Sequence, residues 1–256
     1  MGAGHLHPMF VHRHSPVHHL APEAKVVAAV LCTIVVVATP RTALWAFAGY
    51  AVLIAAIAVL ARIPAGWLAR RSMIELPFVL TAVLLPFLTA GPTVRVLGMD
   101  LAVDGLWAGW NILVKGALGV LIALLLAATT LPRDLIIGLD RLRAPTAITQ
   151  IALFMLRYLD VLADEAKRMR IARISRLDDP RFLWQLRGFA AGIGTLFLRA
   201  FERGERVYLA MKSRGYTGRM PAALHADGTA TARQWMAAAI PPVAAAAIMV
   251  CGRLYA

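Results

Sequence analysis

Long apolar runs separated by short polar breaks fill the first half of the chain and return at its end. About five of these runs approach the roughly 20 apolar residues that cross the hydrocarbon core of a bilayer as one helix. They lie at Ala24–Thr39, Thr42–Ile63, Met73–Ala90, Trp107–Thr130 and Trp235–Val250. The first run is short and the last contains Pro241 and Pro242, so we expect tilted or kinked helices there. The pattern predicts an all-α integral membrane protein with about five transmembrane helices.

A different pattern begins at Pro132. From there to Arg233, Arg and Lys recur every few residues, and the apolar residues keep the spacing of amphipathic helices. We expect no membrane span in this block. The predicted helices are Pro132–Leu142, Thr146–Arg176 and Arg181–Arg214. Pro145 and Pro180 stand at or just before the starts of the two long helices, a position that helix starts allow.

Three glycines of the last predicted helix leave its backbone open to close approach. They are Gly188, Gly192 and Gly194. Small residues are typical of places where two helices pass at short distance. We therefore expect another helix to pass close to this backbone, with these glycines at the helix crossing.

The distribution of charge indicates which side of the membrane each part occupies. The 256 residues are 60% hydrophobic and 16% charged, with a formal net charge of +13, and ionised groups are costly at the bilayer centre. Arg62, Arg70 and Arg71 follow the second predicted span. Asp100 and Asp104 lie in the loop after the third. Because Lys and Arg collect in cytoplasmic loops, we expect a multi-pass cell-membrane protein with its N-terminus and long helices in the cytoplasm.

These observations divide the chain into four parts. Residues 1–22 form a His-rich N-terminal tail, 23–131 carry the first four spans, 132–220 form the domain of long helices, and 221–256 form a linker and the last span. Lys115 falls inside the fourth span and Glu75 near the start of the third. We interpret Lys115 as snorkelling or facing the bundle interior, and Glu75 as a favourable charge in a first helical turn.

The two long helices end in similar basic segments. An offset of 38 residues aligns RMRIARISRL, Arg168–Leu177, with RVYLAMKSRG, Arg206–Gly215. Four positions coincide, namely Arg168 with Arg206, Ala172 with Ala210, Ser175 with Ser213, and Arg176 with Arg214. Cations at helix ends suit the helix dipole, anionic lipid headgroups, or a partner groove lined with carboxylates or carbonyls. The residues alone leave these three interpretations open.

The same region carries a family resemblance. The stretch TTLPRDLIIGLDRLRAPTAITQIALFMLRYLDVLADEAKRMRIARISR, Thr129–Arg176, and the later ERVYLAMKSRGYTG, Glu205–Gly218, resemble the transmembrane T component of energy-coupling factor transporters. The N-terminal HSPVHHLAPEAKVVAA is similar to the cobalt-type branch, CbiQ. The resemblance implies a membrane scaffold with a cytoplasmic coupling domain of crossed long helices. Each of these helices would end in an Ala/Ser-Arg-Gly type motif that docks into a groove of one ATPase subunit.

Carried onto this chain, the resemblance implies two ATPase-coupling motifs. The second, Ser213-Arg214-Gly215, fits the family pattern, whereas the first, Ser175-Arg176-Leu177, has Leu177 where the family usually has Gly. The first motif thus keeps the arginine but lacks the glycine that would favour a tight turn after it. Ala172-Arg173-Ile174 is another frame for the first motif, but only Arg176 keeps the 38-residue register with Arg214.

Candidate metal ligands gather in the N-terminal tail. They are His5, His7, His12, His14, His18 and His19. Neutral imidazole suits cobalt, nickel and zinc, so the tail is compatible with holding cobalt after its entry or with adventitious chelation alone. The motif G-x-x-x-x-G-K-[ST] is absent from the chain. We therefore expect no cofactor in this chain, with ATP and Mg bound by partner subunits.

The predicted function is that of a non-catalytic subunit of a cobalt importer. The resemblance implies two cytosolic ABC-type ATPase subunits (CbiO-like) and a substrate-binding membrane component (CbiM-like), which can be joined by a small accessory membrane subunit. One alternative is a conventional ABC permease subunit for nickel or another substrate, although Glu165-Ala166 lacks the Gly expected of its coupling loop. Another is a membrane-bound enzyme acting on lipids, for which the spans show no acidic or His cluster. The basic blocks lack interleaved aromatics, which argues against a nucleic-acid partner.

Overall fold

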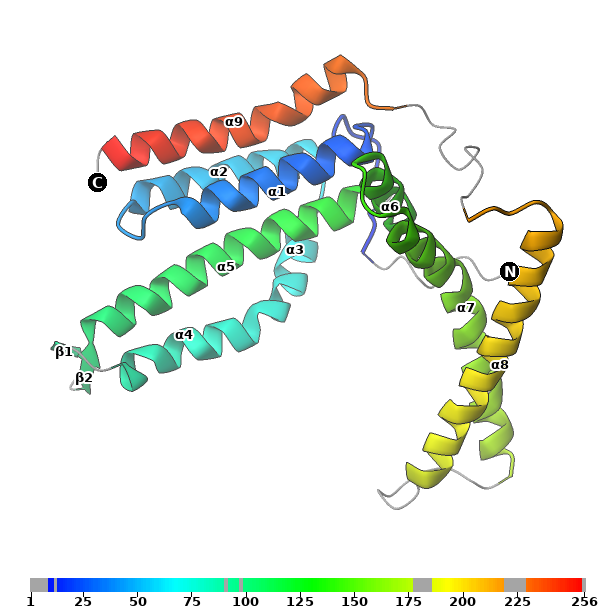
Figure 1. Cartoon of the computed structure of the whole chain (residues 1–256). Helices are drawn as coiled ribbons and strands as arrows, with labels where there is room; N and C mark the ends of the chain where they lie inside the picture. The colour runs from blue at the N-terminus through cyan, green and yellow to red at the C-terminus, as the bar shows by residue number, and fades with distance from the viewer. Residues whose placement is uncertain are drawn as a thin grey trace. The chain divides into compact units, whose positions relative to one another are not determined.

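The computed structural model describes residues 9–11, 13–89, 92–96, 99–176, 186–218 and 229–254 (Figure 1). Contacts divide the chain into two units. One unit, which we call the bundle unit, comprises Met9–Leu142 and Thr229–Ala256. The other, the long-helix unit, comprises Arg143–Gly228 together with Met1–Pro8. Each unit has its own set of helix contacts.

The bundle unit is built of helices joined by short connections. In chain order they are α1 (Pro22–Ala38), α2 (Leu44–Leu60), α3 (Ala65–Arg71), the 3₁₀ helix η1 (Ser72–Glu75), α4 (Leu76–Leu88), α5 (Val103–Thr129), α6 (Pro132–Arg141) and α9 (Ala232–Leu254). An antiparallel hairpin of β1 (Thr93–Val96) and β2 (Met99–Ala102) connects α4 to α5. The hairpin lies in the loop predicted to face outward, and it was not expected from the sequence.

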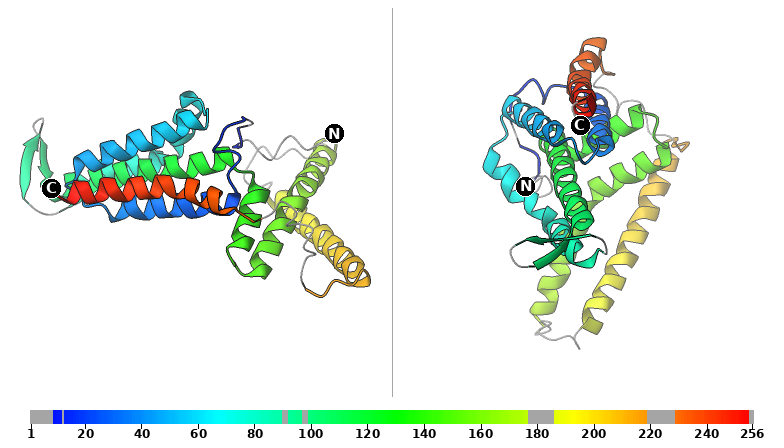
Figure 2. Two further views of the ribbon diagram at one scale, coloured as in Figure 1. Left: turned by 90° about the horizontal axis from the view of Figure 1, so that it is seen from above. Right: turned by 90° about the vertical axis from the view of Figure 1, so that its left-hand side faces the viewer.

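Helices α1, α2, α5 and α9 run side by side and share one hydrophobic core (Figure 2). The buried side chains include Val36 of α1, Phe47, Tyr50 and Ile54 of α2, Leu118, Ile122 and Leu125 of α5, and Ala245 of α9. Thr39 donates to the carbonyl of Val35, so the buried Tyr50 hydroxyl, 2.8 Å from Thr39 Oγ1, is the donor in that contact. The polar end of this aromatic ring is therefore satisfied inside an apolar core.

Glycines bring α5 against α4 and α6 against α1. A Cβ atom added to Gly109 of α5 would lie 2.5 Å from the carbonyl oxygen of Ala82. One added to Gly138 of α6 would lie 2.9 Å from the backbone nitrogen of Glu23. Both distances are shorter than van der Waals contact, so the two backbones approach only because the side chain is absent.

Among the described residues, four helices are long and apolar enough to cross a bilayer, judged by length and composition. They are Ala65–Leu88, Val103–Thr129, Thr146–Ile174 and Ala232–Arg253. Helix α2 is apolar but shorter, with 17 residues, and α1 also has 17. The predicted all-α membrane fold is therefore confirmed, with the hairpin as a small β addition.

One of these four helices lies in the block where we expected no span. Thr146–Ile174 contains an 18-residue window with mean hydropathy 1.4, so the expectation that no apolar run between Pro132 and Arg233 reaches spanning length is wrong for it. The reason is that its acidic and basic residues gather in its second half and leave the first half apolar. Only 6% of that window is buried inside the chain. The location of this helix in the cytoplasm stays a prediction.

The long-helix unit consists of α7 (Thr146–Ile174) and α8 (Leu186–Ser213), which cross (Figure 1). Helix α7 begins at the predicted residue and ends two residues before the predicted Arg176, and α8 ends one residue before the predicted Arg214. At the crossing, Glu165 of α7 accepts from Arg168 Nη2 of the same helix at 2.7 Å and also pairs with Arg199 of α8. A carboxylate shared by two guanidinium groups therefore joins the helices.

Candidate functional site

The end of α8 carries the second predicted motif, Ser213–Gly215. Gly215 has a φ of +84°, a left-handed conformation that glycine adopts at little steric cost. Its N–H donates to the carbonyl of Lys212, and the N–H of Tyr216 donates to the carbonyl of Met211, both at 3.0 Å. This pair of bonds is the Schellman arrangement that closes many helices. The glycine therefore ends α8 and leaves Arg214 exposed just after its last turn.

The end of α7 carries the first predicted motif. Ser175 Oγ donates to the carbonyl four residues earlier at 3.0 Å, and Ser213 Oγ in α8 likewise donates back to its own helix at 3.0 Å. Arg176 follows directly and is exposed, as Arg214 is. The aligned serines and arginines therefore have matching local surroundings. Leu177 lies outside the described residues, so the turn after Arg176 stays untested.

Within the part of the chain that the structure describes, the guanidinium groups of Arg176 and Arg214 are free, as is that of the exposed Arg170. Over the described ranges, neither the Arg176 nor the Arg214 side chain has a hydrogen-bond or ion-pair partner in the chain. Arg173, the arginine of the alternative motif Ala172-Arg173-Ile174, is half-buried and interacts within the chain. Its guanidinium lies against α8, 3.9 Å from where a Cβ of Gly192 would be. This geometry favours Arg176 as the residue available to a partner.

The two arginine-bearing ends lie at opposite ends of the helix pair. Tyr216, just after α8, donates its hydroxyl to Gln150 Oε1 at 2.8 Å, and Gln150 Nε2 donates to the Gly218 carbonyl at 3.3 Å. Gln150 belongs to the first turns of α7, whereas Arg176 follows its last turn. At about 1.5 Å per residue, the length of α7 separates Arg214 from Arg176 by roughly 40 Å.

Of the glycines predicted at the helix crossing, Gly192 faces α7 only through a side chain and Gly194 faces open space. A Cβ on Gly192 would meet only the Arg173 guanidinium, and one on Gly194 would meet nothing within 4 Å. The side-chain surroundings of Gly188 lie outside the described part of α8. A role for Gly188, Gly192 and Gly194 at a helix crossing therefore stays a prediction, and the contact seen is the Glu165 pair.

Exposed apolar side chains follow one face of each long helix, and we call these the apolar stripes. They are Ile148, Ile151, Met155 and Leu159 on α7, and Ile193, Phe197, Phe201 and Tyr208 on α8. The exposed fraction reaches 67% at both Ile151 and Phe197. The members of each set are three or four residues apart, except for the seven residues, or about two turns, from Phe201 to Tyr208, so each set follows one side of its helix. Apolar surface of this kind marks contact with another protein or with lipid.

The described part of the N-terminal tail is anchored through His18. Its Nε2 lies 3.1 Å from the Val11 carbonyl, which can only accept, so Nε2 carries the proton. In the neutral ring Nδ1 then accepts from Ser15 Oγ at 2.7 Å. Burial lowers the pKa of His18 from its ordinary 6.5, and the charge of Lys25 lowers it further, against the opposing effect of the Val11 bond. Both ring nitrogens are thus engaged within the fold.

The other candidate metal ligands are not gathered into a site. His14 and His19 are exposed with their rings stacked at 6.2 Å, while His5, His7 and His12 lie outside the described residues. In the part of the chain that the structure describes, no three His, Cys, Asp or Glu side chains form a group that could hold a metal ion. A metal role for the tail stays a prediction, and His18 would first have to release its hydrogen bonds.

The polar side chains of Lys115 and Glu75 contact other parts of the bundle. Lys115 Nζ donates to the Val37 carbonyl at 2.7 Å, so its ammonium is bound by backbone and not by a carboxylate. Glu75 is buried against Gly116 of α5. A cavity of about 410 Å³ among α1, α2, α5 and α9 is lined almost wholly by apolar side chains, with Lys25 at one end. Its wall suits hydrocarbon better than a metal ion.

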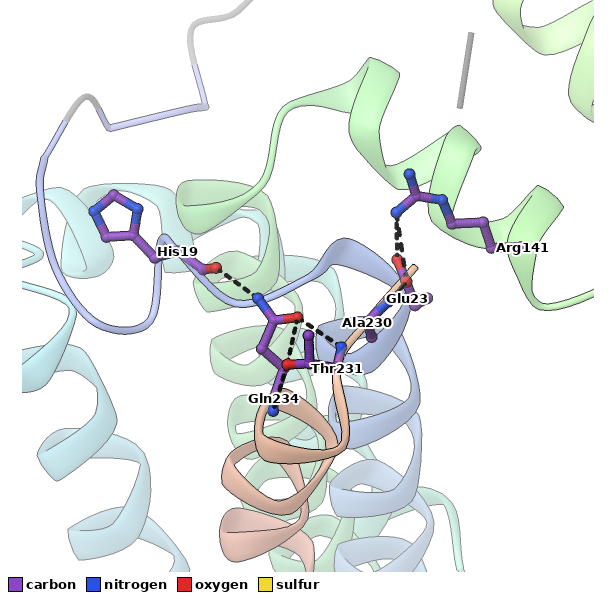
Figure 3. A network of polar contacts seen from close by, with 6 residues as sticks. All are labelled: His19, Glu23, Arg141, Ala230, Thr231 and Gln234. Atoms are coloured by element: carbon purple, nitrogen blue, oxygen red, sulfur yellow. Dashed lines mark hydrogen bonds and ion pairs between the residues drawn. The ribbon is translucent and has the colours of Figure 1, made fainter. Parts of the chain in front are cut away.

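A hydrogen-bond network at the start of α1 was not predicted (Figure 3). Glu23 accepts from Arg141 Nη1 at 3.1 Å and from the backbone N–H of Ala230 at 2.7 Å. Nearby, Gln234 Oε1 accepts from the N–H of Thr231 at 3.0 Å. The sequence held two weak signals for it, an acidic residue in a first turn and the Thr-x-x-Gln pattern of a capping box.

Comparison with known proteins gives a family with this organisation. The sequence matches the family described as "Cobalt transport protein" (CbiQ) over residues 13–223. An "Energy-coupling factor transporter transmembrane protein EcfT" from Staphylococcus aureus is 31% identical over 217 residues, which are 78% of this chain and 79% of that protein. Another from Thermanaerovibrio acidaminovorans is 32% identical over 225 residues, 82% of each chain. A "Cobalt transport protein CbiQ" from Rhodobacter capsulatus is 30% identical over 160 residues, 62% of this chain and 64% of that protein.

The matched region contains both arginine-bearing helix ends and every helix from α1 to α8. Membrane-length apolar helices and relatives that are transporter subunits agree with one another. The chain therefore belongs to the CbiQ family of transmembrane T components of energy-coupling factor transporters.

Proposed function

We propose that this chain is the coupling subunit of a cobalt importer and that Arg176 and Arg214 dock into two cytosolic ATPase subunits. When ATP binding closes the ATPases, the docked arginines move the ends of α7 and α8 relative to each other. The crossed helices pass this movement to a substrate-binding membrane component. One observation carries the proposal: among the described residues, two exposed arginines without partners stand in matching positions at opposite ends of one helix pair.

The separation of the arginines supports two docking partners. A small domain is about 30 Å across, so a spacing of roughly 40 Å is too wide for neighbouring grooves on one such domain. Docking of one arginine on each of two subunits accommodates the distance. The Glu165–Arg199 pair at the crossing gives the two ends a common pivot.

Stabilisation of the helix dipole does not account for these arginines. A cation in the last turn contributes about 0.3–1 kcal/mol. Arg173 in the last turn of α7 and Lys212 in the last turn of α8 already occupy that position. An arginine beyond the last turn, with its planar fork of donors exposed, is suited to carboxylates or helix carbonyls of another protein.

The apolar stripes support contact of the long helices with a membrane partner. Side chains such as Phe197 and Ile151 are two-thirds exposed, and covering them with another apolar surface is favourable. In the proposed complex the partner is the substrate-binding component (CbiM-like), with which a small accessory membrane subunit can associate. The long helices and the N-terminus lie in the cytoplasm in this arrangement.

Cobalt is proposed as the cargo because the N-terminal segment resembles the cobalt-type branch and one relative is named a cobalt transport protein. The metal site is assigned to the CbiM-like component, and ATP with Mg to the CbiO-like ATPases. This chain then contributes no catalytic group. Uptake of nickel measured beside cobalt distinguishes this proposal from a nickel permease.

The test is the double variant Arg176→Glu with Arg214→Glu, expressed with its ATPases and membrane partner. Losing a buried, hydrogen-bonded charge contact typically weakens binding by about 30-fold or more for each arginine. We expect the ATPases to be lost from the purified complex and radioactive cobalt uptake to fall to background. Arg206→Glu, an exposed position on α8, is the matched control and should retain both. Normal co-purification and cobalt import by the double variant would remove the coupling role.

A further inference from the structure

Both connections of the long-helix unit are held by one carboxylate. The chain leaves the bundle unit after Leu142 and re-enters it at Thr229. On the leaving side, Arg141 Nη1 lies 3.1 Å from Oε2 and 3.4 Å from Oε1 of Glu23. On the re-entry side, the N–H of Ala230 donates to the same Oε1 at 2.7 Å (Figure 3). Each partner stands one residue inside the boundary between the units.

The contact is buried and charged, which makes it stiff. The side chains of Glu23 and Arg141 are only 4% and 9% exposed. A buried carboxylate depends on its hydrogen-bond partners, because water does not replace them when they move away. The bond from the guanidinium to the carboxylate is charge-assisted, and such bonds are stronger than those between neutral groups. Displacing Arg141 therefore removes the countercharge of Glu23, and displacing Ala230 removes one of its hydrogen bonds.

Backbone packing fixes the same three elements around Glu23. Gly138 of α6 lies so close to α1 that an added Cβ would be 2.9 Å from the Glu23 nitrogen. Ala24 of α1 and Ala238 of α9 are both buried in one small apolar cluster. Small side chains thus bring α6 and α9 onto the start of α1, as at other close helix contacts.

The described bundle-side ends of the two connections have defined local geometry. Thr231 and Gln234 form a capping box at the start of α9, and Gln234 Nε2 also donates to the His19 carbonyl at 3.4 Å. On the other side, Arg143 has a φ of +65°, a left-handed conformation that a non-glycine residue keeps only where its surroundings fix it. A displacement of the long helices that passes along these connections therefore acts on backbone with a fixed geometry.

We propose that Glu23 is a positioning residue that makes the two connections of the long-helix unit move together with α1. The proposal rests on the coupling function proposed above. A displacement of α7 or α8 reaches the bundle through the backbone at Arg141 or at Ala230. With both points bound to one carboxylate, the displacement moves α1, α6 and α9 as one body. Without it, each connection yields separately and the movement is lost before it reaches the bundle.

The experiment compares three variants in the complete complex with ATPases and membrane partner, reconstituted in liposomes. Glu23→Ala removes both contacts. Glu23→Gln keeps an oxygen for the Ala230 N–H and loses the charge that binds Arg141, whereas Ala230→Pro removes only the N–H donor. The measured quantities are ATP hydrolysis, radioactive cobalt uptake, or nickel uptake if the parent imports nickel, and the melting temperature of the complex.

We expect ATPase co-purification to persist, because Arg176 and Arg214 are untouched, while uptake per ATP hydrolysed falls about tenfold in Glu23→Ala, within the range of coupling between two sites. Glu23→Gln and Ala230→Pro should show smaller losses. Asp104→Asn, an exposed carboxylate at the other end of α5, is the matched control and should keep the parental ratio.

The outcomes separate this inference from the proposed function. A purely local role for Glu23 would lower the melting temperature and the yield of complex but leave uptake per ATP of the surviving complex unchanged, and that result overturns the inference. The inference also fails if all three variants keep the parental ratio while Arg176→Glu with Arg214→Glu abolishes uptake. If the arginine variant itself imports normally, the proposed function fails whatever the Glu23 variants do.

Discussion

The bundle unit and the long-helix unit use the same residue types in opposite ways. In the bundle, Gly109 admits the backbone of α4, and Ile122 is 8% exposed in a core shared by several helices. In the long-helix unit, Gly194 faces open space and Phe197 is 67% exposed. The bundle has a buried core beneath its exposed apolar surface, whereas the described apolar side chains of the long helices contribute none to that core.

Ion pairs show the same contrast. The Arg141–Glu23 pair of the bundle is nearly buried on both sides, while Arg199 and Arg168, which pair with Glu165 in the long-helix unit, are 57% and 63% exposed. A buried pair is stiff, and an exposed pair exchanges readily with water and contributes little to stability. The bundle therefore holds its shape through internal contacts, whereas the long-helix unit leaves its side chains available for contacts with partners.

The difference between the two units is tested most directly by removing one large apolar side chain from each. Ile122→Ala should lower the free energy of unfolding by about 2–5 kcal/mol, since it opens a cavity in a packed core. Phe197→Ala should change it by less than about 0.5 kcal/mol, as exposed positions do. Denaturant titration of the purified chain in detergent measures both. Equal losses in the two variants would mean that the long helices have a core of their own.

The Phe197 variant also tests whether the apolar stripe of α8 binds the substrate-binding component. Because its ring belongs to the exposed stripe of α8, Phe197→Ala should reduce recovery of the substrate-binding component while the chain itself stays folded. Recovery of that component at the parental level would instead assign the stripe to lipid.

Glycines provide the second contrast. Gly109→Ala puts a methyl group 2.5 Å from the Ala82 carbonyl, so α4 and α5 must separate, at a cost of about 1–3 kcal/mol. Gly194→Ala meets no atom, and the better helix propensity of alanine should stabilise α8 by up to about 1 kcal/mol. Opposite signs in thermal unfolding are expected. A loss at Gly194 would show that α8 is closely packed there after all.

Much of the bundle could be predicted because a bilayer imposes a length on apolar helices. The pattern therefore located α1, α2, α4, α5 and α9 within a few residues. It failed for α7, since window hydropathy depends on where charges gather, and those of α7 lie in its second half. It also missed the contacts of Gly109 and Gly138, because a sequence shows that a residue is small but not which helix faces it.

The two parts of the site differed in how far they could be predicted. The arginine-bearing ends were found because their signals are local: a helix end, a Ser-Arg pair and a repeat of 38 residues. The Glu23 network was not found, because its donors at Arg141 and Ala230 are separated from it by 118 and 207 residues. Contacts between such distant positions depend on the tertiary packing of α1, α6 and α9, which the periodicity of each helix does not encode.

The smallest expected effect concerns the pH dependence of the bundle unit. His18 is held as a neutral ring, and its pKa is lowered by burial, so its unfolded form binds a proton more readily than its folded form. Its contribution to stability is therefore complete above the ordinary pKa of 6.5 and is lost as the pH falls through the lowered folded pKa. His18→Gln keeps an N–H donor for Val11 and does not titrate.

Denaturant unfolding at pH 7.5 and 5.5 should show a smaller acid-induced loss of stability in His18→Gln than in the parent. The difference should be smaller than those expected for the apolar and the glycine substitutions. His19→Gln, at an exposed ring, should behave as the parent, and the same acid loss in all three proteins would mean that the hydrogen bonds of His18 do not hold its neutral form.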